Sequence, residues 1–208
     1  MSSQYNVSSI SDLIEICNTP SLNHDVIRLK RIKQSLIALD KMYGMHELKQ
    51  QIVDQVLYYV QKLNTDQMMH TALMGPPGVG KTSIARIIAN LYKELGFLSK
   101  GKLVTVTRED LVGKYLGETA VKTRKVLDNN KGNVLFIDEA YSLGSTSHED
   151  SYAKECIDTI TAFLSENTRD FVCIIAGYPA QLKECFFNAN PGLDRRFPWK
   201  YELNKYNG

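Results

Sequence analysis

The spacing of apolar residues changes character once along the chain, near Asp66. Before that point, apolar residues from Val26 to Leu39 recur at steps of three and four, interleaved with lysine and arginine, which predicts an amphipathic helix. From His46 to about Leu63 they recur every four positions, which predicts a second helix. Residues 1–24 are rich in serine and asparagine and indicate a short helix or a loose arm.

After Asp66, short apolar runs alternate with helical segments. We expect strands within residues 69–74, 102–107, 133–138, 171–177 and 199–203, and helices within 80–95, 118–129, 152–166 and 180–187. Nearly unbroken apolar strands that alternate with helices are typical of a parallel sheet covered on both faces. The pattern therefore predicts an α/β doubly wound domain, preceded by a helical arm over residues 1–40.

Composition excludes several classes of protein. The 208 residues carry a formal charge of +2, which leaves no electrostatic footprint for nucleic acid or for an anionic membrane. No apolar run approaches the length of a membrane span, so we expect no membrane association. The four cysteines form no C-x-x-C pair, so we expect reduced thiols in a cytoplasmic protein.

The stretch GPPGVGKT at residues 75–82 fits the phosphate-binding pattern G-x-x-x-x-G-K-[ST]. It follows an apolar run and opens a predicted helix, which is the context the pattern requires. Gly78 and Gly80 allow the backbone to curl closely around phosphates, Lys81 is expected to reach the β- and γ-phosphates, and the Thr82 hydroxyl to hold Mg²⁺. The alternative is a glycine turn before a helix, but such a turn does not require lysine followed by threonine.

The apolar run VLFIDE ends in two acids, Asp138 and Glu139. Ligands of parallel sheets bind beyond the carboxyl ends of the strands, so Asp138 is placed to hold Mg²⁺. Glu139 is then the candidate general base for an attacking water. The alternative is a strand end with two solvated carboxylates.

Several blocks, in the same order, resemble the AAA+ ATPases, and in particular the branch that includes red-type rubisco activase and the sporulation stage V protein K. The resemblance covers roughly residues 40–200 and rests on YGMHELKQQI, GPPGVGKTSIARIIANLYKELGFLSKGKLV, REDLVGKYLGETAVKTRKVL, VLFIDEAYSL, AKECIDTI, IIAGYP and NPGLDRRFP. It implies a P-loop NTPase fold, a three-layer αβα sandwich whose five parallel strands have the order 5-1-4-3-2. Residues 41–208 would then be the large ATPase domain.

The resemblance also implies site residues. Tyr43 and Gly44 match the segment beside the adenine, and Arg196 matches the arginine finger that acts on a neighbour's γ-phosphate, with Arg195 as the competing candidate. The expected nucleotide-binding residues are Tyr43, Gly44, Pro76, Pro77, Gly78, Val79, Gly80, Lys81, Thr82, Ser83, Asp138 and Tyr178, and the expected catalytic residues are Glu139, Lys81 and Arg196. The expected cofactors are ATP and Mg²⁺.

Two features depart from the family pattern. Tyr178 occupies the sensor position after the fourth strand, where many family members have a small polar residue such as asparagine. The sequence also ends at Gly208, before the small helical lid of the family. From the missing lid we expect weak assembly and low ATPase activity for this chain alone.

The stretch VGKYLGET matches the family's first pore loop, with Lys114, Tyr115 and Leu116 as the residues offered to a substrate. The resemblance thus implies a protein-remodelling motor that forms a ring, expected to be a hexamer, and pulls on a client polypeptide. Three other interpretations stay open: a nucleic-acid motor or loader, a scaffold that binds ATP but turns it over slowly, and a P-loop kinase. The charge balance disfavours the first, Tyr178 and the missing lid favour the second, and the DE pair disfavours the third.

Overall fold

The computed structural model describes residues 7–60, 68–115, 117–144 and 150–203. The five strands are β1 (Thr71–Met74), β2 (Leu103–Val106), β3 (Val134–Ile137), β4 (Val172–Gly177) and β5 (Trp199–Glu202). The helices are α1 (Ile10–Asn18), α2 (His24–Arg31), α3 (Lys33–Asp40), α4 (His46–Val60), α5 (Lys81–Leu95), α6 (Arg108–Leu111), α7 (Thr119–Asn129), α8 (Ser151–Glu166) and α9 (Pro179–Gln181). Short helical turns complete the chain at η1 (Ala140–Leu143), η2 (Leu182–Phe186), η3 (Phe187–Ala189) and η4 (Asp194–Arg196).

The strands form one parallel sheet in the order β2-β3-β4-β1-β5, which is the predicted order read from the other edge. In this register Thr71 of β1 lies between Ile174 of β4 and Trp199 of β5. Each expected apolar run contains one strand, trimmed by one or two residues at its ends. The predicted P-loop NTPase topology is therefore confirmed.

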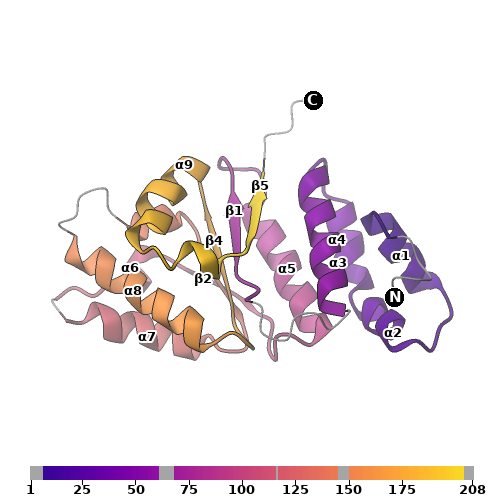
Figure 1. Ribbon diagram of the computed structural model, residues 1–208, viewed down its shortest axis with the longest axis horizontal. Coiled ribbons are helices and arrows are strands. Elements are labelled where there is room, and N and C mark those ends of the chain that lie inside the picture. Colours follow the sequence, from indigo (N-terminus) through magenta and orange to yellow (C-terminus); the bar gives the residue numbers. More distant parts are fainter. Residues whose placement is uncertain (1–6, 61–67, 116, 145–149, 204–208) are drawn as a thin grey trace.

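Alternate side chains of the strands enter two separate cores. In β3, Val134 and Phe136 join the core beneath α1–α5, whereas Leu135 and Ile137 join the core beneath α7 and α8. Figure 1 shows the corresponding three layers, with the sheet between α5 and the α7–α8 pair. Because both faces are buried, the strands have the continuous apolar character seen in the sequence.

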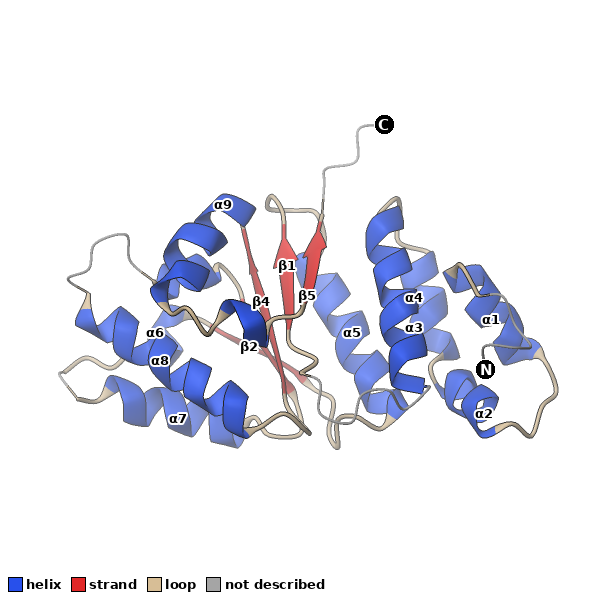
Figure 2. Cartoon of the chain, viewed as in Figure 1, coloured by secondary structure: helices blue, strands red, loops and turns tan. Residues whose placement is uncertain are grey.

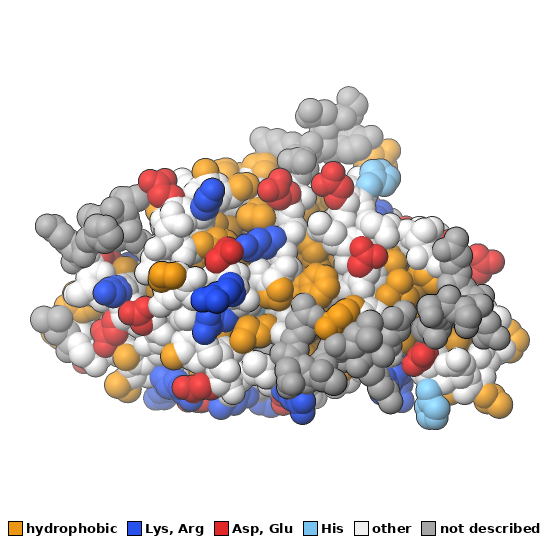
Figure 3. Space-filling view, in the orientation of Figure 1, with side chains coloured by type: hydrophobic (Ala, Val, Ile, Leu, Met, Phe, Trp, Pro, Cys, Tyr) orange, Lys and Arg blue, Asp and Glu red, His pale blue; other side chains and the backbone are white. Residues whose placement is uncertain are grey.

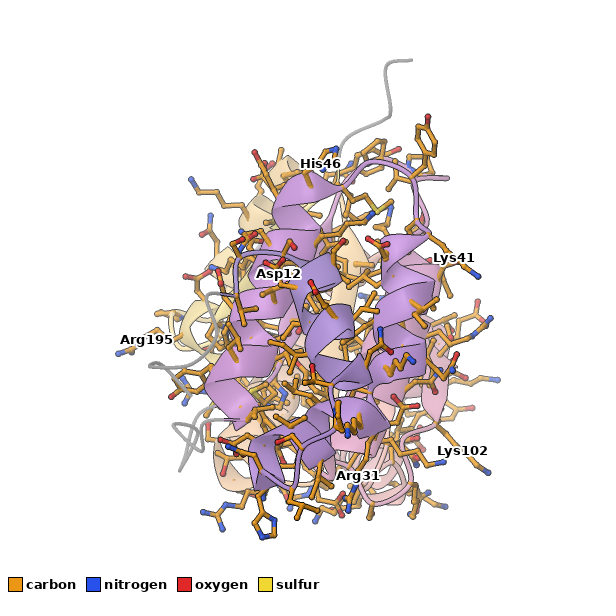
Figure 4. All side chains as sticks on the ribbon, turned by 90° about the vertical axis from the view of Figure 1, so that its right-hand side faces the viewer. Asp12, Arg31, Lys41, His46, Lys102 and Arg195 are labelled. Carbon is orange, nitrogen blue, oxygen red and sulfur yellow. The ribbon has the colours of Figure 1, made fainter. Side chains whose placement is uncertain are left out.

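The N-terminal helices extend the first of these cores. Apolar residues of α1, α2 and α3 share it with α4 and α5, and Figure 4 views these helices from their outer side, with Asp12 on α1 and Arg31 on α2 labelled. A capping box between Ser9 and Asp12 fixes the start of α1. The single helix expected from Val26 to Leu39 is wrong, because the helix breaks at Ile32.

The break at Ile32 is a local tightening that keeps the apolar side chains in phase. The Ile32 N–H bonds the carbonyl of Leu29, three residues back, at 3.1 Å, and its ψ of 3° departs from the helical value. The Ile32 side chain is fully buried. Periodicity cannot reveal such a break, because the buried positions before and after it still recur at three and four.

In Figure 2, α1–α3 lie at one end of the molecule, and α7 and the loop before it lie at the opposite end. On the face shown in Figure 3, acidic and basic side chains are interspersed, with basic ones along the lower margin. Within the part of the chain that the structure describes, no helix has both the length and the apolarity needed to cross a membrane.

Candidate active site

The loop between β1 and α5 has the backbone that its glycines predict. Gly78 and Gly80 adopt left-handed φ angles of 80° and 92°, which favour glycine. Gly75 is required for a different reason: a Cβ there would lie 2.3 Å from the carbonyl oxygen of Leu203, just after β5. The loop is also tied to β4, the strand beside β1 in the sheet, because the Gly75 N–H donates to the Gly177 carbonyl at 3.0 Å.

Lys81 begins α5 and turns back over the loop. Its Nζ donates to the carbonyls of Gly75 and Pro76 at 2.9 and 2.8 Å. Gly80 precedes the helix and offers no side-chain cap, so the first N–H groups of this 15-residue helix have no side-chain partner from the N-cap. A helix start of this kind, next to a lysine, is suited to anion binding.

The two predicted acids follow β3 and lie across from this helix start. Asp138 and Glu139 are both exposed, and the Glu139 N–H donates to the Asp138 carboxylate at 3.0 Å. Glu139 has a left-handed backbone, with φ 50° and ψ 43°. For a residue with a side chain this conformation costs about 1–2 kcal/mol, and such strain is frequent at functional sites.

A hollow of about 340 Å³ brings these residues together at the carboxyl ends of β1, β3 and β4. It is lined by Pro77, Gly78, Gly80, Lys81, Thr82, Ser83, Asp138, Glu139, Tyr141, Gly177 and Tyr178. Two predicted loop residues are placed differently: Val79 packs against the core, and Pro76 contributes its carbonyl to Lys81. The hollow therefore combines a positively polarised helix end with two carboxylates.

Tyr141 is a lining residue that the sequence interpretation did not include. It lies on η1, two residues after Glu139, and its ring centroid is 6.4 Å from that of Tyr178. Burial raises the pKa of the Tyr141 phenol, and the charge of Glu139 and a hydrogen bond to its carboxylate raise it further. The sequence signal that could have found Tyr141 is its position three residues after Asp138, just beyond the end of a strand. Aromatic residues at such positions usually serve packing alone.

The predicted adenine segment lies at the other side of the phosphate loop. Tyr43 is 76% exposed, and Gly44 has a left-handed φ of 67°. Neither lines the hollow, but the neighbouring Met42 and Met45 reach the loop: a Cβ at Gly80 would lie 3.5 and 4.0 Å from their methyl carbons. The methionines flank the Tyr43-Gly44 pair in sequence and were not predicted as site residues.

The arginine pair on η4 is split between two environments. Arg196 is held within its own chain, since Nε and one terminal nitrogen donate to the Ser165 hydroxyl at 2.9 and 2.8 Å and the other bonds the Gly192 carbonyl. Arg195 is exposed and projects away from the body of the molecule in Figure 4. Neither arginine lines the hollow of its own chain.

The stretch VGKYLGET connects α6 to α7 and presents Tyr115 outward. The Tyr115 side chain is 70% exposed, and Lys114 is exposed beside it. Leu116 lies outside the described residues. Gly113 approaches the start of α7 so closely that a Cβ would be 2.7 Å from that of Glu118. The glycines thus fix a tight turn that directs the tyrosine outward.

A model of the ATPase family associated with various cellular activities (AAA) matches residues 71–189, more than half of the chain. The chain belongs to this family. Membership implies nucleotide binding, and residues 71–189 include the phosphate loop and the two acids. A crystal structure of the FIGL-1 AAA domain in complex with ADP superposes with a TM-score of 0.55 at 20% identity, over 89% of this chain and 64% of that one. At that identity the likeness supports the fold.

Curated relatives point to the branch named above. The cfxQ-like protein R730 of Acanthamoeba polyphaga mimivirus is 44% identical over 181 residues, which are 86% of this chain and 45% of that protein. Stage V sporulation protein K of Bacillus subtilis is 38% identical over 86% of this chain and 56% of its own length. The chloroplastic ribulose bisphosphate carboxylase/oxygenase activase of Cyanidioschyzon merolae is 38% identical over 80% and 59%. The chain therefore spans about half the length of these relatives.

Proposed function

We propose that this chain is the ATP-binding and ATP-hydrolysing core of a ring-forming motor that remodels a protein. The observation that carries the proposal is the hollow in which the phosphate loop, the start of α5 and the acids Asp138 and Glu139 converge. Phosphate transfer to water needs an anion cradle, a cation and a proton acceptor within one small volume. The described hollow supplies residues of all three kinds.

Each lining residue has a role that follows from its chemistry. The loop amides and the helix start bind the phosphates, while Lys81 exchanges its bonds to the Gly75 and Pro76 carbonyls for phosphate oxygens. Thr82 and Asp138 would hold Mg²⁺, which would neutralise phosphate charge. Glu139 accepts the proton of the attacking water.

The donor set for Mg²⁺ suits a shared site. Among the described residues, no group of three or more His, Cys, Asp or Glu side chains could hold a metal ion. One hydroxyl and one carboxylate fit a cation that keeps several waters and takes other ligands from phosphate. We therefore expect Mg²⁺ affinity to depend on nucleotide.

Replacing Glu139 with Gln tests hydrolysis directly. The amide keeps the size of the side chain but removes the proton acceptor, so we expect ATP turnover to fall at least a hundredfold while ATP affinity stays within about threefold. Glu155→Gln on α8, a half-buried acid outside the hollow, is the control. Turnover that is unaffected by Glu139→Gln would leave a nucleotide-binding scaffold as the better description.

Ring formation would complete the site from a neighbour. The finger residue must reach another subunit's phosphate, and both candidates on η4 lie outside the hollow of their own chain. We infer that Arg196 is the finger and exchanges its bonds to Ser165 and Gly192 for that contact on assembly, with the exposed Arg195 as the competing candidate. Light scattering with and without ATP tests assembly.

The two arginines can be separated by comparing variants. Arg196→Ala should lower turnover only at concentrations where rings form, and should also lower the free energy of unfolding by about 1–2 kcal/mol, because it removes charged hydrogen bonds within the chain. Arg195→Ala should leave turnover unchanged and the free energy of unfolding within about 0.5 kcal/mol. If Arg195→Ala instead abolishes ring-dependent turnover while Arg196→Ala spares it, Arg195 is the finger.

Engagement of a polypeptide is assigned to Lys114, Tyr115 and Leu116. A bulky side chain on an outward turn can grip an extended chain without reading its sequence, and Tyr115 is exposed on such a turn. Tyr115→Ala should keep ATP affinity but lose the stimulation of turnover by an unfolded probe such as casein. Retained stimulation would remove the threading role and leave ATP hydrolysis intact.

The same proposal covers organisation and location. We infer that residues 1–40 form a helical extension docked on the ATPase domain of residues 41–208, because α1–α3 share a core with α4 and α5. We also place the protein in the cytoplasm, as its four cysteines are free thiols and three of them are buried. Removal of residues 1–40 should expose that core and cause aggregation, which size exclusion would detect.

A further inference from the structure

The exits of β3 and β4 are joined by an aromatic side chain that the proposed ATPase chemistry does not account for. Tyr141 leaves the β3 exit on η1 and packs its ring on Gly177, the last residue of β4. A Cβ on Gly177 would lie 2.9 Å from Cδ1 of Tyr141. A contact this close requires glycine at 177, and it fixes where the ring lies.

Tyr141 and Glu139, two residues apart beyond β3, both line the hollow, and the Tyr178 ring lies 6.4 Å from the Tyr141 ring at 45° to it. The phenol pKa is raised by burial first, then by the charge of Glu139 and by the hydrogen bond to its carboxylate. The phenol is therefore protonated at neutral pH and available as a donor.

The backbone of Glu139 makes such a partner useful. Its left-handed conformation aims the side chain from a strained turn that one backbone bond closes, from the Ser142 N–H to the Glu139 carbonyl at 2.8 Å. That bond fixes the turn but not the carboxylate. A donor to one carboxylate oxygen would restrict rotation and leave the other oxygen to accept from water.

We propose that Tyr141 is a positioning residue that holds and orients the carboxylate of Glu139. The inference rests on the proposed function in one respect, since Glu139 is the proton acceptor only if the hollow hydrolyses ATP. The packing of the ring on Gly177, which sets where the phenol lies in the hollow, is a property of the fold. Tyr178, packed against the same ring, links the predicted sensor position to the acid through Tyr141.

Turnover kinetics test the consequence for hydrolysis. Tyr141→Phe keeps the ring on Gly177 and removes the hydroxyl, so we expect kcat to fall about tenfold while KM for ATP stays within twofold. In the Glu139→Gln background, the same substitution should cause no further loss in single-turnover assays. Tyr152→Phe on α8, outside the hollow, is the matched control and should change neither constant.

A second substitution moves the ring without touching the hydroxyl. Gly177→Ala places a methyl group 2.9 Å from Cδ1 of Tyr141 and 3.0 Å from Cγ of Leu182, so the Tyr141 ring must shift and kcat should fall to a similar extent as in Tyr141→Phe. The two changes combined should be no worse than the more severe of them. An undiminished kcat in Tyr141→Phe, or a full additional loss in the Glu139→Gln background, would overturn the proposal.

A spectroscopic measurement decides the contact without any activity. With 3-fluorotyrosine at position 141, the phenol can be titrated by ¹⁹F NMR, and Glu139→Gln should move that titration to lower pH because it removes the neighbouring charge. An unchanged titration would show that Tyr141 does not hold Glu139. If instead the titration moves while Glu139→Gln spares ATP turnover, the proposed function fails and the Tyr141–Glu139 contact stands.

Discussion

The loop after β1 and the connection after β2 both join a strand to a helix through glycines, yet they are held in different ways. The β1 loop is held by its backbone: Gly75 bonds Gly177, and Lys81 bonds the carbonyls of Gly75 and Pro76. Its glycines Gly78 and Gly80 are left-handed. Among the described hydrogen bonds, Lys81 supplies the only side chain that holds this loop. The loop N–H groups after Gly75 are therefore available to phosphates.

The β2 connection is held by side chains instead. Thr107 and Asp110 form a capping box at α6, Lys122 bonds the carbonyls of Glu109 and Val112, and the Gly113 N–H donates to the Thr119 hydroxyl. These braces leave Tyr115 outward. Two glycine-rich loops of one sheet are thus held differently: the β1 loop presents its backbone to the hollow, and the β2 connection presents the Tyr115 side chain to solvent.

The largest effect expected from this comparison concerns nucleotide affinity. Gly80→Val places a β-branched residue at a φ of 92°, and Gly117→Val does so at 83° in the other loop. We expect Gly80→Val to weaken ATP binding at least a hundredfold, because it displaces the amides of the cradle. Gly117→Val should leave affinity within about twofold. Titration with a fluorescent ATP analogue measures both, and equal losses would contradict the division of labour.

A smaller effect on stability is expected at Gly75. A methyl group there meets the Leu203 carbonyl, so Gly75→Ala should lower the free energy of unfolding by about 2–3 kcal/mol. Gly78→Ala, in the same loop, meets nothing within 4 Å and should cost about 1 kcal/mol, from its positive φ alone. Urea unfolding of the two variants separates crowding from backbone strain.

The side-chain braces predict a pH effect at the base of the β2 connection. Arg108 of α6 donates to Asp150, which caps α8, and to the Ser142 carbonyl of η1. The pKa of Asp150 is lowered, first by the Ala153 N–H and then by Arg108. Its stabilisation is therefore complete above the ordinary aspartate pKa of about 3.9 and is lost as pH falls through the lower folded-state value.

Comparison with Asp150→Asn measures that contribution. We expect the wild-type chain to be about 1 kcal/mol more stable at pH 7, with the difference shrinking in acid. Guanidinium unfolding across this pH range would show it. A difference that is constant with pH would mean that the charge of Asp150 contributes nothing.

The smallest effect is expected at the outward residue itself. Tyr115→Ala should change the free energy of unfolding by less than about 0.5 kcal/mol, because 70% of the side chain is exposed. Tyr92→Ala, which truncates a buried tyrosine of α5, should cost about 3–5 kcal/mol. If Tyr115→Ala were as costly as Tyr92→Ala, the tyrosine would be a packing residue and its outward placement would need revision.

The sheet could be predicted from the sequence because the patterns that specify it lie within short stretches of the chain. Continuous apolar runs, each followed by a helical period, specify parallel strands, and the GPPGVGKT spacing places Lys81 and Thr82 at a helix start. Lining of the hollow by Asp138 and Glu139 follows from the strand-end rule for ligands in parallel sheets. These expectations need no knowledge of which side chains meet.

The features that escaped prediction depend on contacts between distant segments. Tyr141 matters because its ring meets Gly177, 36 positions away, and no local pattern reports that approach. Met42 and Met45 reach Gly80 only once α4 is docked beside the phosphate loop. The hydrogen bonds of Arg196 to Ser165 likewise arise from the packing of η4 on α8, which the sequence motif cannot express.

The contact between Gly75 and Leu203 has a mechanical consequence. The Leu203 N–H donates to the Met74 carbonyl at 2.7 Å, and the Leu203 carbonyl sits where a Gly75 side chain would be. Any polypeptide that continues from Leu203 starts its path against the first residue of the phosphate loop. A shift of that loop would therefore displace Leu203, and with it the start of whatever polypeptide follows.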